Sequence, residues 1–580
     1  MNKSIKKYRA YLLKRLLGLS LLTCLLVGSF PSVGQNIESI GKNKPIKVTG
    51  GVSVNTIGYS AFGIDDRRDP FNYFASGNLN LSLYGWSVPL SFTFSNQNTA
   101  FQQPFNQYGM HPTYKWVTAH IGYVGMTFSP YTLNGHQFLG VGVDLQPTEK
   151  LKVSAMYGRL LKAVLPDSTN DSNIPTFARM GYGFKASYGS SSDNIGLVIF
   201  KASDDETSLG NLPDSLELFP EDNVVISIDG SKTIVKDLVF SAEWATSAVS
   251  RNKLSETYES ENRNILSYLH TQRLTTSYFN AYKMALSYKI GSYAVGAGYE
   301  RIDPGYRTLG AYYFNNDLEN ITVNAATSIL KGKVSLSTNV GVQRDNLDNT
   351  KISAMNRFTG SGNVGYTPSN RLNMSASYSN FRTFTNIRSQ FTDINQLTPY
   401  DNIDTLDFTQ ISQSTNMNAN YVLSSSETKR QNLSFNASYQ QASDEQGGVE
   451  QSSGSQFYTL NGAYSMNIVP RNMSVTVAFN YNNNKAGDLN STTTGPTLAV
   501  NRTFLDKKLR SSASVSLNNA YTASLLTNRI INGRVSGSYS VEKKHNFTLS
   551  LVAINRETLR EGASEAFTEL TGTFGYSYRF

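Results

Sequence analysis

The sequence predicts an all-β protein, a transmembrane antiparallel barrel of about 24 strands, on three observations. Apolar and polar side chains alternate along most of the 580-residue chain, many alternating segments are long, and short connections alternate with long ones. Alternation with a period of two gives a strand two chemically different faces. The alternating segments run about 10–14 residues, which fits tilted membrane strands better than the shorter strands of soluble proteins. Bacterial single-chain barrels have even strand counts, so we expect about 22–26 strands.

Residues 1–34 are predicted to be a secretory signal peptide. Six Lys or Arg residues precede Leu16, and an apolar run extends from Leu16 to Phe30. Ser32 and Gly34 supply the small residues of a cleavage site after Gly34. A short membrane anchor is the alternative, but a spanning helix needs about 20 apolar residues.

Removal of this peptide changes the composition of the protein. Six of the 52 basic residues leave with it, so 46 basic residues face 43 acidic ones and the net charge falls from +9 to +3. Nucleic acid is therefore not an expected partner, because that reading needs a basic folded surface. The only cysteine, Cys24, is also removed, although the residues before it loosely resemble a lipoprotein signal. We expect a short N-terminal lead at 35–45 and a single barrel domain at 46–580.

Short and long polar connections alternate along the barrel segment. The short turns are expected at 147–150, 290–292, 331–333, 368–371, 470–472, 506–508 and 542–544. The long loops are expected at 97–113, 166–177, 203–222, 250–275, 303–320, 382–411, 442–455 and 484–494. Tight periplasmic turns and long extracellular loops are typical of an outer-membrane barrel, so we expect the chain in the bacterial outer membrane, in contact with lipid.

The C-terminal segment carries a specific pattern. Phe574, Tyr576, Tyr578 and Phe580 alternate with small or polar residues, and the chain ends on Phe580. An aromatic final strand of this kind resembles the signal read by the barrel-insertion machinery, which is therefore an expected partner during biogenesis. The alternative is an ordinary aromatic strand at the end of the chain.

No catalytic, cofactor-binding or metal-binding residues are predicted. The five histidines are scattered and lack zinc-site spacing: His111, His120, His136, His270 and His545. Nucleophile-elbow and phosphate-loop motifs are absent from the sequence. The acidic stretch 203–222 lacks the spacing of a calcium loop, so we interpret it as a solvated loop. We expect no enzyme activity and no cofactor.

One segment combines charges, aromatic rings and turn formers. Its candidate functional residues are Arg301, Asp303, Tyr306, Arg307 and Asp317. Asp303-Pro304-Gly305 is a strong turn sequence, and Arg301 and Asp303 are close enough in sequence to pair. Such a loop either folds inward as a constriction or docks a partner; a well-packed loop without a ligand is the alternative.

This segment, the Gly34-Gln35 junction, the stretch 105–109 and Tyr114-Lys115-Trp116 resemble large, mostly uncharacterised outer-membrane β-barrel proteins of the Bacteroidota. The resemblance implies fold and location, and it brings no catalytic residue. TonB-dependent transporters resemble the chain less well. They carry a plug domain before the barrel, whereas alternation begins here near Val48.

A barrel of this predicted width needs something to fill it, because barrels of 16–18 strands already leave an aqueous channel. The first hypothesis is a channel or transport protein whose own loops, such as 303–320 or 382–411, constrict the lumen. The second is a non-enzymatic barrel subunit of a multi-protein machine for secretion, insertion or surface-protein handling, with outer-membrane or periplasmic protein partners. A structural or adhesive barrel is a third, weaker hypothesis. The sequence names no solute.

Overall fold

The computed structural model describes residues 46–580 with internal gaps. The gaps are 84, 97–105, 167–174, 211–217, 259–264, 351–355, 381–412, 443–444, 447–448, 451–453 and 561–562. The predicted signal peptide (1–34), the predicted lead (35–45) and the proposed filling loop 382–411 lie outside the described residues. Residues 48–81 and 85–580 form one compact unit, and every site discussed below lies within it.

Nearly all described residues belong to β-strands or to the connections between them. The two short 3-10 helices are η3 (Ile265–Tyr268) and η5 (Val469–Arg471). The strands are β1 (Ile46–Phe62), β2 (Phe71–Leu83), β3 (Trp86–Ser95), β4 (Gln107–Met110), β5 (Thr113–Tyr114), β6 (Val117–Gly125), β7 (Gln137–Leu145), β8 (Leu151–Leu161), β9 (Arg179–Gly189), β10 (Asn194–Asp204), β11 (Asp222–Val235), β12 (Leu238–Ser250), β13 (Thr276–Ile290), β14 (Tyr293–Ile302), β15 (Leu318–Ile329), β16 (Val334–Arg344), β17 (Asn356–Ser369), β18 (Leu372–Asn380), β19 (Gln413–Ser425), β20 (Lys429–Ala442), β21 (Glu445–Gln446), β22 (Val449–Glu450), β23 (Ser455–Ile468), β24 (Met473–Ala486), β25 (Leu489–Phe504), β26 (Leu509–Thr522), β27 (Leu525–Val541), β28 (His545–Arg560) and β29 (Ala563–Arg579).

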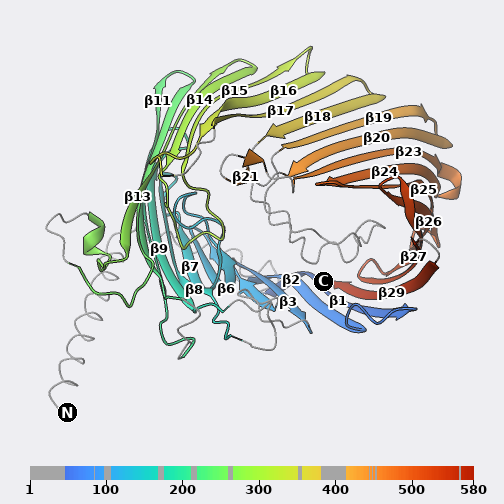
Figure 1. The fold of residues 1–580 in the computed structure, drawn as a ribbon, viewed down its shortest axis with the longest axis horizontal. Helices are drawn as coiled ribbons and strands as arrows, with labels where there is room; N and C mark the ends of the chain where they lie inside the picture. The colour runs from blue at the N-terminus through green and yellow to red at the C-terminus, as the bar shows by residue number, and fades with distance from the viewer. Residues whose placement is uncertain are drawn as a thin grey trace. The chain divides into compact units, whose positions relative to one another are not determined.

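These strands close into one antiparallel barrel. Consecutive strands pair, and the first and last strands close the sheet through Gly51 opposite Arg579 and Phe62 opposite Thr568 (Figure 1). β4 and β5 share one position between β3 and β6, whereas β21 and β22 form a separate hairpin. The described strands therefore occupy 26 barrel positions, the upper end of the predicted range. The predicted fold class is confirmed.

The predicted short turns all join strands at the end of the barrel where β1 starts and β29 finishes. Most predicted long loops lie at the opposite end, as antiparallel neighbours require. The prediction for 484–494 is wrong, because β24 continues to Ala486, β25 begins at Leu489, and Gly487 (φ 56°) closes a tight turn. The prediction for 97–113 is too long, because β4 and β5 lie within it. The polar residues of β4, of the end of β24 and of the start of β25 are strand, so polarity alone misidentified them as loop.

The two faces of the wall are identified by the exposure of alternate side chains. In β10, Ile195 is 62% exposed, whereas Val198 and Phe200 on the other face are fully buried. In β24, Val477 and Phe479 are exposed on the same outer side. Apolar residues point outward in this way around the barrel, which is the pattern of a lipid-facing surface. No helix of the described residues is long and apolar enough to cross a membrane.

Candidate functional site

Two loops fold against the inner face of the barrel. They are the β6–β7 loop (residues 126–136) and the β14–β15 loop (residues 303–317). Phe128 of the first loop lies over Gly183, where an added Cβ would meet its ring at 2.6 Å. At Gly310 of the second loop, an added Cβ would lie 2.7 Å from the ring of Phe200. Gly183 and Phe200 both point inward, so both loops occupy space on the lumen side of the wall.

The two loops are joined to each other by hydrogen bonds. The Tyr306 hydroxyl donates to the backbone oxygen of Tyr131 at 2.9 Å, and the Thr308 hydroxyl donates to that of Thr132 at 2.7 Å. The backbone nitrogen of Asn134 donates to the Gly310 oxygen at 2.9 Å. Tyr306 is fully buried. The loops are far apart in sequence but form one hydrogen-bonded unit.

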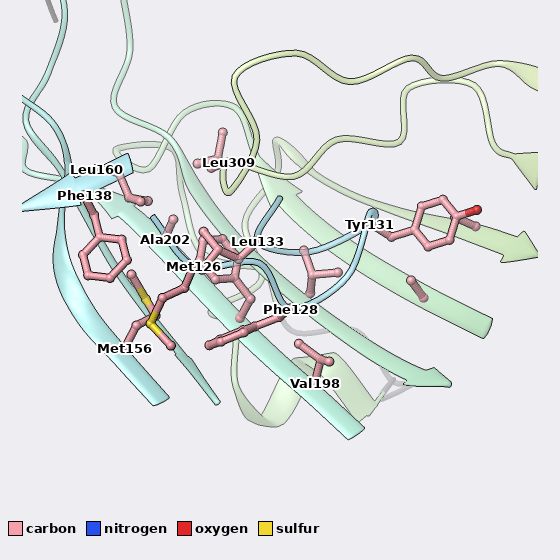
Figure 2. Close-up of a cluster of buried hydrophobic side chains, with 14 of the residues drawn as sticks. Met126, Phe128, Tyr131, Leu133, Phe138, Met156, Leu160, Val198, Ala202 and Leu309 are labelled. Carbon is pink, nitrogen blue, oxygen red and sulfur yellow. The ribbon is translucent and has the colours of Figure 1, made fainter. Parts of the chain in front are cut away.

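An apolar cluster holds this unit against the wall (Figure 2). The strands contribute inward-pointing side chains that a water-filled lumen would leave exposed, among them Phe138, Met156, Leu160, Val198 and Phe200. The loops contribute Met126, Phe128, Tyr131, Leu133, Tyr306 and Leu309. Full burial of a large apolar side chain contributes roughly 1.5–3 kcal/mol. Docking of the loops is therefore mainly a hydrophobic association inside the barrel.

Polar side chains of the wall bind the backbone of the loops. The amide oxygen of Asn223 accepts a hydrogen bond from the Leu309 nitrogen at 3.0 Å. The Ser247 hydroxyl donates to the Arg307 oxygen at 2.6 Å, and the Lys185 ammonium donates to the Phe128 oxygen. Asn223 and Ser247 are fully buried. These bonds satisfy backbone groups that would otherwise be buried unpaired, so they fix where each loop docks.

Ion pairs connect the wall strands to the β14–β15 loop at the end of the barrel that carries the long loops. The Arg179 guanidinium donates to Asp204 at 2.6 Å and to Glu221 at 2.9 Å. The Arg307 guanidinium reaches the other oxygen of the same Glu221. Glu221 therefore links the β14–β15 loop to the start of β9 through Arg307 and Arg179.

The structure brings together only part of the predicted candidate set. Tyr306 and Arg307 belong to the docked unit, as described above. Asp303 and Asp317 shape the ends of the loop, where the Asp317 nitrogen donates to the Asp303 oxygen at 3.3 Å. The Asp303 carboxylate also accepts the Asn280 backbone nitrogen at 2.8 Å. Arg301 pairs with Asp303 at 3.8 Å, as the sequence suggested, but it lies on the outer face of β14 and does not line the lumen.

Two buried titratable groups stabilise the docked loops in their neutral forms. The His136 ring stacks on Tyr312 at 3.9 Å between centroids and donates from Nδ1 to the Gln137 oxygen at 2.8 Å. Burial lowers the pKa of His136 to about 4, so the ring is neutral near pH 7. The Tyr131 hydroxyl donates to Glu300 at 2.5 Å, and burial together with this carboxylate raises the pKa of Tyr131 far above its usual value.

The inner wall from β15 to β29 has different chemistry. Its inward positions carry mainly Ser, Thr and Asn, and many of them hydrogen-bond between neighbouring strands. Asn480 donates to Thr497 at 3.1 Å and also bonds to Asn461. The hydroxyl oxygens of Ser512 on β26 and Ser536 on β27 lie 2.6 Å apart and share a hydrogen bond. This wall presents neutral hydroxyl and amide groups, which suits a polar lumen.

The predicted insertion residues form the outer edge of the closing strand. Phe574 is exposed on the outer face of β29, and Tyr576 lies against Phe547 with ring centroids 5.0 Å apart. Tyr578 and Phe580 meet edge to face at 4.9 Å. The Phe580 nitrogen donates to the Gly50 oxygen at 3.0 Å, which continues the pairing of β29 with β1. Their role as an insertion signal stays a prediction.

Histidine and acidic side chains form two further clusters. On the inner wall, the two rings of His111 and His120 lie 2.8 Å apart at their Nδ1 atoms, and His120 Nε2 lies 2.8 Å from Asp144. Within the described part of the chain, no group of three His, Cys, Asp or Glu is arranged to hold a metal ion. In the acidic stretch 203–222, Asp204 and Glu221 are engaged by arginine instead of being solvated as predicted.

Sequence reasoning missed a buried Ser–His–Asp chain on the outer face. Ser250 Oγ lies 2.8 Å from His270 Nε2, and His270 Nδ1 lies 3.3 Å from Asp222. Ser250 is fully buried, beneath the β12–β13 loop that also carries His270. Opening that loop to admit a substrate would carry the histidine away from the serine. The Ser250–His270 hydrogen bond and the close approach of His270 to Asp222 therefore hold the loop against the outer wall.

Sequence reasoning also missed the β6–β7 loop, which was absent from the expected long loops. Its sequence from Met126 to His136 contains aromatic rings, a proline and a glycine, the features that helped to single out the β14–β15 loop, but it lacks the charged residues of that loop. The inward apolar positions of β10, Val198 and Phe200, were a second signal, because an aqueous lumen does not call for them.

Among known proteins, the chain is similar only to proteins of solved structure. No protein-family model and no curated protein matches the chain. The P pilus usher (PapC) translocation pore is 10% identical with a TM-score of 0.37, covering 92% of this chain and 100% of its own. The FrpB iron transporter (F5-1 variant) from Neisseria meningitidis is 9% identical with a TM-score of 0.34, covering 92% and 82%. The outer membrane protein OprD from Pseudomonas aeruginosa is 8% identical with a TM-score of 0.31, covering 71% and 92%. At these values the likeness concerns the barrel fold alone and assigns no activity to this chain.

Proposed function

We propose that this chain is an outer-membrane channel whose lumen is narrowed by its own β6–β7 and β14–β15 loops. The observation that carries the proposal is the apolar cluster on the inner face. Its side chains would be exposed to water in an open lumen, and the two loops bury them. The opposite wall of Ser, Thr and Asn supplies a hydrated surface along which a polar solute can move. Solute passage is then confined to the part of the lumen that the two loops leave uncovered.

Conductance tests this function directly. Purified full-length protein is reconstituted in planar bilayers, and single-channel currents are recorded. We expect discrete steps of conductance smaller than those of a variant lacking residues 303–317. An absence of conductance from both proteins would contradict the channel. Isolation from native membranes with a stoichiometric protein partner, together with that absence, would favour the machine subunit instead.

Location is tested through the closing strand. Because Phe580 continues the pairing of β29 with β1, its deletion should reduce the amount of protein recovered in the outer membrane. Replacement by Tyr, which keeps an aromatic ring at the terminus, is the matched control. A native protein that stayed soluble in the periplasm would refute the membrane location. The proposed dependence on insertion machinery is tested by the same fractionation in a host depleted of that machinery.

A further inference from the structure

A pocket of about 620 Å³ lies in the wall where β25 to β29 meet β1. Its lining includes Arg510, Ser512, Arg534, Ser536, Asn546 and Thr548. The lining contains no Asp or Glu among the described residues. A polar pocket with only positive charges is unusual on this wall, which is otherwise dominated by neutral groups.

Two of the pocket's arginines belong to the lumen face. Val515 and Val535 are exposed on the outer face of β26 and β27. Strand alternation therefore directs Arg510 and Arg534 inward. A third arginine, Arg502, is an even number of residues from the exposed Leu498 and so lies on the outer face of β25. Its guanidinium carbon lies 4.7 Å from the centroid of the Phe504 ring.

The two inward arginines flank a band of hydroxyl groups. Arg510 is opposite Ser538, and Arg534 is opposite Ser514. The row between them contains the bonded pair Ser512 and Ser536. Four residues of strand separate Arg510 from Ser514, a distance of about 13 Å along β26.

This arrangement has a chemical preference. The planar guanidinium fork binds carboxylate or phosphate oxygens in pairs, and hydroxyl and amide groups bind the hydroxyls of a ligand. The inward acidic residues Asp229, Glu243 and Glu300 lie on the other wall, where Lys283 is opposite both Glu243 and Glu300. Glu569 of β29 also has inward parity, but it is buried, accepts the Tyr59 hydroxyl at 2.5 Å and is not part of the pocket lining. An anion is therefore attracted to this pocket, whose described lining carries arginines and no carboxylate.

We propose that Arg510 and Arg534 form a lumenal binding site for small hydroxylated organic anions. The inference rests on the proposed channel function, and it names the class of solute that the channel favours. The arginines supply the charge recognition, and the hydroxyl band between them holds the polar body of the solute. A neutral sugar of the same size binds more weakly because it lacks the group that the arginines recognise.

Calorimetry on full-length protein in detergent tests the site without requiring conduction. Gluconate and glucose 6-phosphate serve as carboxylate and phosphate probes, and glucose is the neutral comparison. We expect one or both anions to bind more tightly than glucose, and Arg510→Gln with Arg534→Gln to weaken that binding about tenfold or more. Arg529→Gln, which removes one positive charge from the outer face of β27 outside the pocket, should leave it unchanged. Equal binding of glucose, or unchanged anion binding in the double variant, would overturn the proposal.

Reversal potentials in a salt gradient then separate this inference from the channel function. We expect the native channel to prefer chloride over potassium, and the Arg510→Gln, Arg534→Gln variant to lose that preference while still conducting. A conducting channel whose preference ignores both arginines would overturn the site and leave the channel standing. A protein that binds anions through these arginines without conducting would retain the site and overturn the channel.

Discussion

The inner walls of the two parts of this barrel differ in chemistry although the same alternation builds both. From β6 to β14 the inward positions include Val198, Phe200 and other apolar residues, and long loops cover them. From β15 to β29 the inward positions are mainly Ser, Thr and Asn, and β24–β25 and β26–β27 are joined by tight turns. An apolar inner face therefore marks the part of a barrel wall where a loop docks, and a polar inner face marks the part that stays hydrated.

The largest effect on conductance should come from removing a large side chain from the inner apolar cluster. Phe128→Ala removes a nearly buried ring from the inner cluster, and such a deletion costs about 3–5 kcal/mol of packing energy. We expect the β6–β7 loop to undock and single-channel conductance to rise several-fold. Tyr157→Ala, which removes an exposed ring from the outer face of β8, should leave conductance unchanged. Equal currents from all three proteins would show that the covered wall does not narrow the lumen.

Acid should weaken the docking of the β6–β7 loop by protonating His136. Its pKa is lowered from about 6.5 in an unfolded chain to about 4, so the folded form binds fewer protons between these values. Docking free energy is then complete above about pH 6.5 and falls by about 3 kcal/mol as the pH approaches 4. We expect conductance to rise over that window and the rise to shrink in His136→Phe, which keeps the stacking ring. The same pH profile in both proteins would contradict a role for this histidine.

A smaller effect should follow from loss of a backbone anchor. Asn223→Ala leaves the buried Leu309 nitrogen without its acceptor, at a cost of about 1–3 kcal/mol. Hydrogen exchange at Leu309 should accelerate by about one to two orders of magnitude. Exchange in the β17–β18 turn serves as the internal control and should stay constant. A uniform change across the barrel would indicate global destabilisation instead.

The smallest effect is expected on the uncovered wall. Asn480→Ala removes bonds to Asn461 and Thr497, but water in the lumen can replace them. We expect the melting temperature of the protein to change little, because such a substitution costs about 1 kcal/mol or less. A cost comparable to that of Asn223→Ala would mean that this wall is covered as well, and the contrast between the two regions would fail.

The fold was largely predictable because strand alternation and turn length are local properties of the sequence. The strands and the positions of the short turns follow from them, whereas the even strand count came from the general rule for bacterial barrels. The stretch 484–494 was misassigned as a loop because it is rich in Asn and Thr. These residues belong to strands β24 and β25, whose inner face is polar because it lines the lumen.

The candidate site was predictable only in part, because loop docking depends on contacts between distant segments. The composition of the β14–β15 loop pointed to Tyr306 and Arg307. Its partner, the β6–β7 loop, and the anchors Asn223 and Ser247 come from other strands. Arg301 shows the opposite error, because one position along a strand changes the face on which a side chain lies.

The central claim is that the β6–β7 and β14–β15 loops are bound to each other inside the barrel. Cysteine cross-linking between positions 132 and 308 tests it, since the Thr308 hydroxyl lies 2.7 Å from the Thr132 oxygen. In a background with Cys24 replaced by Ser, Thr132→Cys with Thr308→Cys should cross-link rapidly with a short bifunctional reagent. Thr132→Cys with Ser512→Cys, on the opposite wall, should not. Failure of the first pair, or equal cross-linking of both, would contradict the account.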